Sequence, residues 1–155
     1  MIEEPGIPSN GLADPSAKLV LIVDDDMSIL DLMEHVVRKE GFKVERGADG
    51  AEAVHKARTL NPDLILLDFM LPGMGGYEVV KELQVDNSSI PVVIFTGRQM
   101  DRSSVEMVRQ ERNVRDFLQK PVKPAVLCTV LHRLLKTRPP EMKRAADRGP
   151  LSSQW

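Results

Sequence analysis

Short apolar runs alternate with helical patterns through the middle of this 155-residue chain. Residues 19–23, Leu-Val-Leu-Ile-Val, are apolar at every position, as in a strand that is buried on both faces of a sheet. Strands are expected at residues 19–23, 42–44, 63–67, 91–95 and 116–118. A helical spacing of apolar residues follows each of them. This alternation predicts an α/β fold, a five-stranded doubly wound parallel sheet with five helices on its two faces.

Several residues mark the ends of the predicted helices. Gly41 suits a left-handed position just after the first helix, Asp49 can cap the second, and Pro62 interrupts it. The fourth helix is expected at about residues 103–112 and the last at 121–136.

One domain is expected between two irregular ends. Residues 1–16 and 137–155 are rich in proline, glycine and serine, which favour irregular structure. They are therefore predicted to be a flexible N-terminal arm and a flexible C-terminal tail around a domain at residues 17–136.

Composition argues against several classes of protein. The net charge of -2 disfavours nucleic acid as the main partner, because neutralising phosphates requires a basic surplus. Cys128 is the single cysteine, so it cannot form an internal disulfide, and a buried structural thiol is expected. No apolar run approaches the roughly 20 residues of a membrane span, and the acidic N-terminus does not resemble a secretory signal. A cytoplasmic protein that contacts neither membrane nor DNA is expected.

Groups that can do chemistry stand at four predicted strand ends. Residues 24–26, three aspartates, follow the first strand; Asp68 follows the third, Thr96 the fourth and Lys120 the fifth. Ligands of parallel sheets bind at the carboxyl ends of the strands, so these groups are expected to face one pocket.

The expected pocket carries more negative than positive charge. Carboxylates of Asp24, Asp25 and Asp68 in one cleft repel each other, and a hard divalent cation such as Mg²⁺ relieves that repulsion. Asp26 is expected instead to cap the helix that starts near Ser28. A carboxylate nucleophile, a metal, a lysine and a hydroxyl are together the parts that aspartyl phosphorylation requires.

Four segments, residues 23–26, 67–74, 95–97 and 116–121, resemble the signatures of the response-regulator receiver family of two-component signalling. The resemblance covers about residues 18–136. It implies a flavodoxin-like fold, as in chemotaxis regulators, with strand order 2-1-3-4-5.

The resemblance also implies roles for the acidic residues. Asp68 would be the phosphoacceptor, which takes its phosphoryl group from a phosphohistidine on a sensor histidine kinase or a histidine phosphotransfer protein. Asp25, Asp68 and the backbone carbonyl of Met70 would bind Mg²⁺ directly, and Asp24 would act through water. The chain would be no enzyme beyond phosphorylating and dephosphorylating itself.

A switch is implied beside the acidic residues. Thr96 and Lys120 would contact the phosphoryl group, and the bond from Lys120 to Pro121 would be cis. Phe117 stands at a position that is usually aromatic in receivers and that rotates on activation. We expect phosphorylation to draw Thr96 inward and to bury Phe117; the alternative is a core phenylalanine with a single rotamer.

The chain departs from the family pattern at three places. Gly75-Gly76 replaces a usual Asp-Gly, and Asn113-Val114 replaces a usual Gly-Ala, where asparagine can keep a left-handed turn. The interval from Thr96 to Lys120 is about two residues longer than is common in the family, and the extra residues are expected in the fourth helix or its flanking loops. Arg98, with Met70, is expected to flank the path of the hydrolytic water.

The expected output is a set of protein contacts with an effector that the sequence does not identify. The 19 residues after Lys136 are too few for an output domain, so a single-domain regulator without DNA-binding output is expected. A homodimer through the fourth helix, fifth strand and last helix is a further expectation.

Two other readings compete with a phosphorylated receiver. Asp24, Asp26 and Ser28 resemble the nucleophile motif of haloacid-dehalogenase-type phosphatases, but acidic metal ligands soon after Lys120 are missing. A degenerate receiver that only binds partners would lack some of the acidic, hydroxyl and lysine groups that are present here. The three histidines lack metal-ligand spacing and are expected at surface or half-buried positions; they are His35, His55 and His132.

Overall fold

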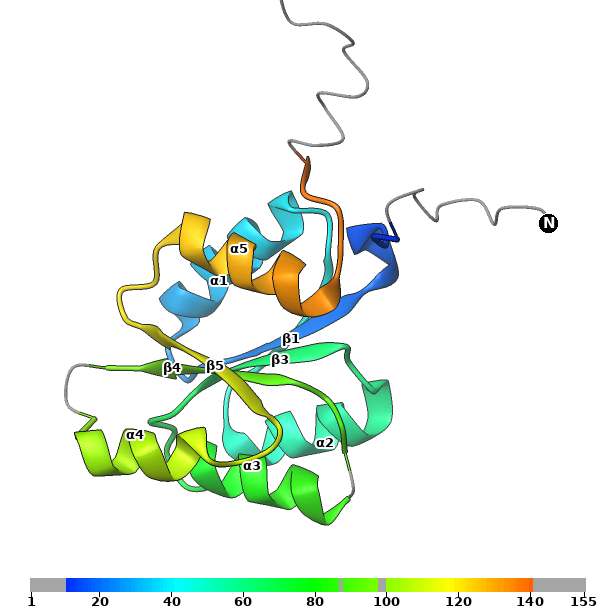
Figure 1. Ribbon diagram of the computed structural model, residues 1–155. Coiled ribbons are helices and arrows are strands. Elements are labelled where there is room, and N and C mark those ends of the chain that lie inside the picture. Colours follow the sequence, from blue (N-terminus) through cyan, green and yellow to red (C-terminus); the bar gives the residue numbers. More distant parts are fainter. Residues whose placement is uncertain (1–10, 87, 98–99, 141–155) are drawn as a thin grey trace, which may run out of the picture.

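The computed structural model describes residues 11–86, 88–97 and 100–140. Within these residues a five-stranded sheet lies between two helical layers, with α1 and α5 on one face and α2, α3 and α4 on the other (Figure 1). The strands are β1 (Leu19–Val23), β2 (Lys43–Gly47), β3 (Leu64–Asp68), β4 (Val92–Thr96) and β5 (Val114–Gln119). The helices are α1 (Met27–Lys39), α2 (Gly50–Leu60), α3 (Gly76–Val85), α4 (Arg102–Arg109) and α5 (Pro124–Leu135), and the short 3-10 helix η1 (Pro15–Ala17) precedes β1.

The strand order is β2-β1-β3-β4-β5 and every neighbouring pair is parallel, which confirms the predicted topology. A helix crosses over after each of the first four strands, because parallel strands cannot be joined by a hairpin. The register pairs Asp68 with Phe95, and Thr96 with Gln119. The carboxyl ends of β1, β3, β4 and β5 therefore lie at one edge of the sheet.

Alternate residues of the strands enter two separate hydrophobic cores. Val20 and Ile22 of β1 pack in the core under α1 and α5, whereas Leu21 and Val23 pack in the core under α2, α3 and α4. All residues of β3 and β4 are buried, as are four of the five residues of β1, the run that was predicted to be buried on both faces. The two cores hold the central strands rigidly, and the groups at their ends are held with them.

The helix ends follow the predicted capping residues. The side chain of Asp26 accepts hydrogen bonds from the amides of Ser28 and Ile29 at the start of α1. Asp49 accepts from the amide of Glu52 at the start of α2. Gly41 has the positive φ of 105° that was expected after α1. These caps satisfy backbone groups that the helix itself leaves without partners.

The structure corrects the predicted bounds of α4, β5 and α5. Helix α5 begins at Pro124 rather than at residue 121, because the residue before a proline avoids helical backbone angles, and Lys123 is extended (φ -80°, ψ 126°). Helix α4 is shorter than expected. Strand β5 is longer and is irregular: Val92 pairs with Val114, but Val93 pairs with Asp116. Arg115 is thus one extra residue, which takes up part of the long interval from Thr96 to Lys120.

Asn113 does not adopt the left-handed backbone that the sequence predicted. Among the described residues other than glycine, positive φ occurs at Asn61 and Lys136. Asn113 is buried. Its side-chain Oδ1 accepts a hydrogen bond from Gln84, and its side-chain Nδ2 donates one to the backbone carbonyl of Val80. The side chain thus ties the start of β5 to α3 and needs no special turn.

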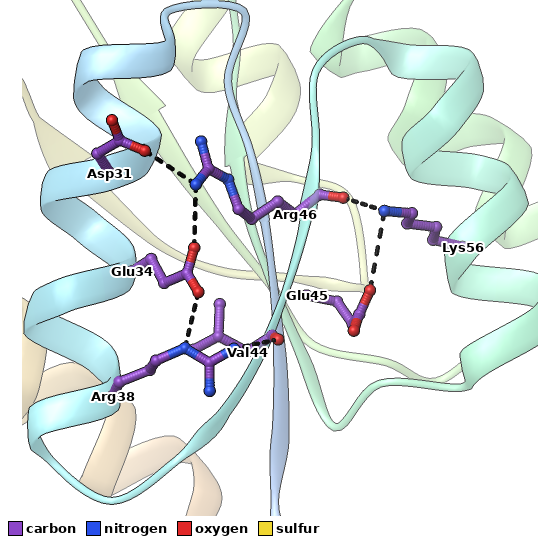
Figure 2. A network of polar contacts seen from close by, with 7 residues as sticks. All are labelled: Asp31, Glu34, Arg38, Val44, Glu45, Arg46 and Lys56. Carbon is purple, nitrogen blue, oxygen red and sulfur yellow. Dashed lines mark hydrogen bonds and ion pairs between the residues drawn. The ribbon is translucent and has the colours of Figure 1, made fainter.

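Strand β2 is an edge of the sheet, and cationic side chains cover its free side. Arg38 of α1 donates to the carbonyl of Val44 and Lys56 of α2 donates to that of Arg46 (Figure 2). Glu34 holds this arrangement by accepting from Arg38 at 2.7 Å and from Arg46 at 3.1 Å. The bond from Arg38, above all, lowers the pKa of Glu34. The covered carbonyls are closed to an added strand.

The two described ends of the chain meet beside η1. Ala13 donates to the carbonyl of Lys136 and accepts from the amide of Arg138, both at 2.9 Å, and Thr137 is buried. Residues 13–15 and 137–138, which the sequence assigned to the arm and the tail, therefore pack against the domain predicted at residues 17–136. The flexible arm and tail stay predictions, since residues 1–10 and 141–155 lie outside the described residues.

Two expectations from composition have different outcomes. Cys128 is half-buried, so the predicted buried thiol is not borne out in full. In the part of the chain that the structure describes, none of the helices combines the length and the apolar character that a membrane crossing requires.

Candidate functional site

The aspartates after β1 occupy three different environments. Asp24 is fully buried, its amide donates to the carbonyl of Gly47 at 3.1 Å, and its Oδ1 accepts from the amide of Asp26 at 2.9 Å. Asp25 is exposed to solvent, and Asp26 caps α1. Consecutive residues thus point in different directions as the extended strand turns into the helix. Asp24 and Asp25 face the carboxyl end of β3.

Asp68 is the last residue of β3 and is 4% exposed. Its Oδ1 accepts a hydrogen bond from the amide of Met70 at 3.1 Å. Its Oδ2 lies 3.2 Å from Nζ of Lys120, and the same Nζ lies 2.9 Å from Oδ2 of Asp24. The ammonium group of Lys120 therefore bridges two buried carboxylates that come from different strands.

The negative charge at this site exceeds the positive charge. Burial, followed by the charge of Asp24, raises the pKa of Asp68, although Lys120 and the Met70 amide act in the opposite direction. Burial alone would lower the pKa of Lys120, but the hydrogen bond to Asp24 and the charges of Asp68 and Asp24 outweigh it, and the pKa is raised. The raised pKa of Lys120 reflects the negative charge of the two carboxylates that it contacts.

The residues fit a divalent cation. One carboxylate oxygen from each of Asp24, Asp25 and Asp68 lies within 4.8 Å of the other two. Mg²⁺ prefers oxygen ligands, usually takes one or two carboxylates and retains several waters. The raised pKa of Asp68 and the solvent access of Asp25 agree with a site that binds such an ion from the open side.

Thr96 and Phe117 lie on the side of the site formed by β4 and β5. Thr96 ends β4, is 9% exposed, and its carbonyl accepts from the amide of Lys120 at 2.9 Å, so the two strand ends are joined. Phe117 is half-buried and packs against the core under α3 and α4. The guanidinium of Arg109 on α4 lies 5.0 Å from the centre of the Phe117 ring, within the range of a cation–π contact.

The other predicted positions have mixed outcomes. His132 is buried, contrary to expectation: its ring bonds to Thr137 at 2.7 Å and to Glu40 at 3.0 Å. His35 and His55 are exposed, as expected. The side chain of Met70 is exposed. Arg98 lies outside the described residues. The bond between Lys120 and Pro121 is cis, as the resemblance implied.

Sequence reasoning missed two features that shape the site. The contact of Arg109 with Phe117 joins residues of α4 and β5 whose relative placement no local pattern specifies. Gly50 and Gly76 stand where two backbones approach too closely for any side chain. The pair Gly75-Gly76 was noted only as a departure from the family pattern, although glycine at a helix start is itself a signal of close approach.

A comparison with protein families matches residues 20–132 to the response regulator receiver domain. The chain belongs to this family. The receiver is 37% identical over 138 residues to the DNA-binding response regulator MtrA of Mycobacterium bovis, covering 86% of this chain and 59% of MtrA. It is 36% identical over 107 residues to the alkaline phosphatase synthesis transcriptional regulatory protein PhoP of Bacillus subtilis, covering 69% of this chain and 44% of PhoP.

Solved structures show the same receiver fold. A putative response regulator from Chloroflexus aurantiacus has 31% identity and a TM-score of 0.68, and it covers 76% of this chain and 97% of its own. Chemotaxis protein CheY4 of Vibrio cholerae has 30% identity and a TM-score of 0.69, and it covers 76% and 98%. The receiver thus matches almost the full length of these two crystallised chains, but it spans about three fifths or less of the curated regulators.

Proposed function

We propose that Asp68 accepts a phosphoryl group from a histidine kinase or a histidine phosphotransfer protein in a reaction that requires Mg²⁺. The observation that carries the proposal is the bridge of Lys120 between Asp24 and Asp68, with Asp25 exposed beside them. Asp25, Asp68 and the carbonyl of Met70 would bind the ion directly, and Asp24 through water. Asp24 is fully buried and accepts from Asp26 and Lys120, whereas Asp25 is open to solvent, which supports an indirect role for Asp24.

The side chains have distinct tasks in this reaction. The amide of Met70 holds Oδ1 of Asp68, which leaves Oδ2 facing Lys120 as the attacking oxygen. This oxygen bonds to phosphorus as the bond to the histidine nitrogen of the donor breaks and that nitrogen keeps the electron pair. Lys120 and the hydroxyl of Thr96 would bind the phosphoryl oxygens. Bound Mg²⁺ would offset the charge of the aspartates and of the phosphoryl group.

Phosphorylation by a small donor tests the assignment of Asp68. Incubation with acetyl phosphate and Mg²⁺ is expected to add one phosphoryl group, and peptide mapping should locate it at Asp68. Chelation with EDTA should prevent the addition, because the acidic site would then repel the donor. Beryllofluoride is expected to bind at the same carboxylate. A modification at Asp24 would instead favour the phosphatase reading, and no modification would favour a receiver that only binds partners.

We also propose that Thr96 and Phe117 form the switch. Phe117 lacks a hydroxyl, so packing must favour its inward position, and the contact with Arg109 must be given up when the ring turns inward. The two states should differ by only a few kcal/mol, so that a phosphoryl group can shift the population.

A structural comparison tests the switch. Crystals of the beryllofluoride-bound protein are expected to show Phe117 in a different rotamer, away from Arg109, and Thr96 closer to Asp68. The metal-free protein, crystallised under matched conditions, is the control. The same Phe117 rotamer in both states would mean that the ring is an ordinary core residue and that the signal leaves by another route.

The proposed output of the switch is a set of contacts with an effector protein. A single-domain regulator, without direct DNA binding, and a homodimer through α4, β5 and α5 remain predictions. MtrA is named a DNA-binding response regulator, and this chain spans 59% of it, so a DNA-binding output is the alternative. The proposal also includes autodephosphorylation at Asp68. It includes a cytoplasmic location, with which the single cysteine and a histidine-kinase donor are compatible.

A further inference from the structure

Gly50, the first residue of α2, is in contact with the loop between β3 and α3. A Cβ atom added at Gly50 would lie 2.2 Å from the carbonyl oxygen of Met74 and 2.9 Å from its Cβ. Real Cβ atoms do not come this close to a backbone oxygen, so any side chain here must displace the helix or the loop. Gly50 is buried, and its φ is not positive, so close approach explains the glycine better than backbone angle.

A second glycine holds the other end of the same loop. A Cβ at Gly76 would lie 2.8 Å from Cα of Phe69 and 3.0 Å from the carbonyl oxygen of Asp68. The amide of Gly76 also donates to the carbonyl of Phe69 at 3.0 Å. Residues 69–75 are therefore closed into a tight loop at their ends, and Gly50 supports the loop from outside at Met74.

This loop carries the groups that complete the site. The amide of Met70 orients Asp68, and the carbonyl of Met70 is the third protein ligand in the proposed Mg²⁺ site. The side chain of Met70 is 62% exposed, so its own packing does little to hold the loop. Leu71, the next residue, is buried in the core under α2, α3 and α4, and the glycine contacts hold the loop on either side of it.

We propose that Gly50 is a positioning residue for Mg²⁺ binding. It touches neither metal nor substrate. By lacking a side chain, it lets α2 come against Met74 and hold the loop that carries Met70, whose amide donates to Asp68. Mutation of groups that hold the ligands of a metal typically lowers the affinity for that metal by about 10–100-fold. The inference rests on the proposed Mg²⁺ site and adds to it a residue from a helix that contributes no ligand.

Gly50→Ala and its matched control Gly75→Ala test this inference in the full chain. Gly75 lies in the same loop region with φ -74°, and a Cβ there would meet only the carbonyl oxygen of Phe69, at 3.9 Å. Calorimetry without any phosphodonor measures the Mg²⁺ affinity, and urea titration measures the free energy of unfolding. NMR measures the chemical shift of the Met70 amide. Gly50→Ala should weaken Mg²⁺ binding by about tenfold or more and shift the Met70 amide. Gly75→Ala should change the affinity by less than about twofold, since surface changes are usually small.

Phosphorylation separates a positioning role from a purely structural one. The rate of labelling of Gly50→Ala by acetyl phosphate should be low at limiting Mg²⁺ and return toward the wild-type rate at saturating Mg²⁺. Where Gly50→Ala does not fold, Met74→Gly removes the Met74 side chain, whose Cβ is the second-nearest atom to that position, and frees the loop backbone; it should also weaken Mg²⁺ binding. A loss of stability with unchanged Mg²⁺ affinity would overturn the role of Gly50 alone. Absence of Mg²⁺ binding by the wild-type protein would overturn both this inference and the proposed function.

Discussion

Lys120→Met is expected to lower the midpoint of thermal unfolding by about 10 °C when metal is removed with EDTA. The ammonium group lies 2.9 Å from Asp24 and 3.2 Å from Asp68, and both carboxylates are almost fully buried. Removing one partner of a buried ion pair leaves uncompensated charge and costs about 3 kcal/mol. In a domain of this size each kcal/mol corresponds to roughly 2–4 °C. Scanning calorimetry at pH 7 measures the difference.

Added Mg²⁺ should reverse much of this loss, because the cation supplies the charge that the variant lacks. The midpoint of Lys120→Met is therefore expected to rise more with Mg²⁺ than that of the wild-type protein. Lys123→Met is the matched control: Lys123 is exposed, and its side chain makes no capping bond to α5. Equal midpoints for the wild-type protein and Lys120→Met in EDTA would contradict the charge balance described for the site.

Asp68→Asn is expected to abolish labelling by acetyl phosphate and to raise the unfolding midpoint in EDTA. Burial and the charge of Asp24 raise the pKa of Asp68, so at neutral pH its ionised form costs folding free energy. Asparagine removes that cost and can still accept the amide hydrogen bond of Met70. A gain of about 1 kcal/mol would raise the midpoint by roughly 3 °C.

The sign of the pH dependence gives an independent check. When a carboxyl group has a higher pKa in the folded protein than in the unfolded chain, the free energy of unfolding falls as the pH rises through that range. The advantage of Asp68→Asn should therefore be full near pH 7 and shrink as the pH falls toward the ordinary value of 3.8. Asp31→Asn makes the same chemical change at a 70% exposed carboxylate and should have a small effect at either pH. A lower midpoint for Asp68→Asn in EDTA at pH 7 would show that the ion pair with Lys120 outweighs burial.

The predictions that succeeded depend on short-range patterns. The apolar run at residues 19–23 and the alternation with helices correctly predicted a parallel sheet, and Asp26, Asp49 and Gly41 mark helix ends as expected. Each is decided within one turn of helix or one strand. Where a distant residue intervened, the predictions were wrong: His132 is buried between Glu40 and Thr137, and the start of β5 is held by the side chain of Asn113.

The amino-acid order alone was enough to place carboxylates, a hydroxyl and a lysine after particular strands, because hydrophobic periodicity and strand ends are local properties. Their environments required the folded chain. Strand order and register bring Lys120 between Asp24 and Asp68, which are far apart in sequence, and packing decides that Asp24 is buried and Asp25 exposed. The approach of Gly50 to Met74 also depends on how α2 lies against the sheet. Distances between separate elements arise from the packing of both cores together, and no segment specifies them by itself.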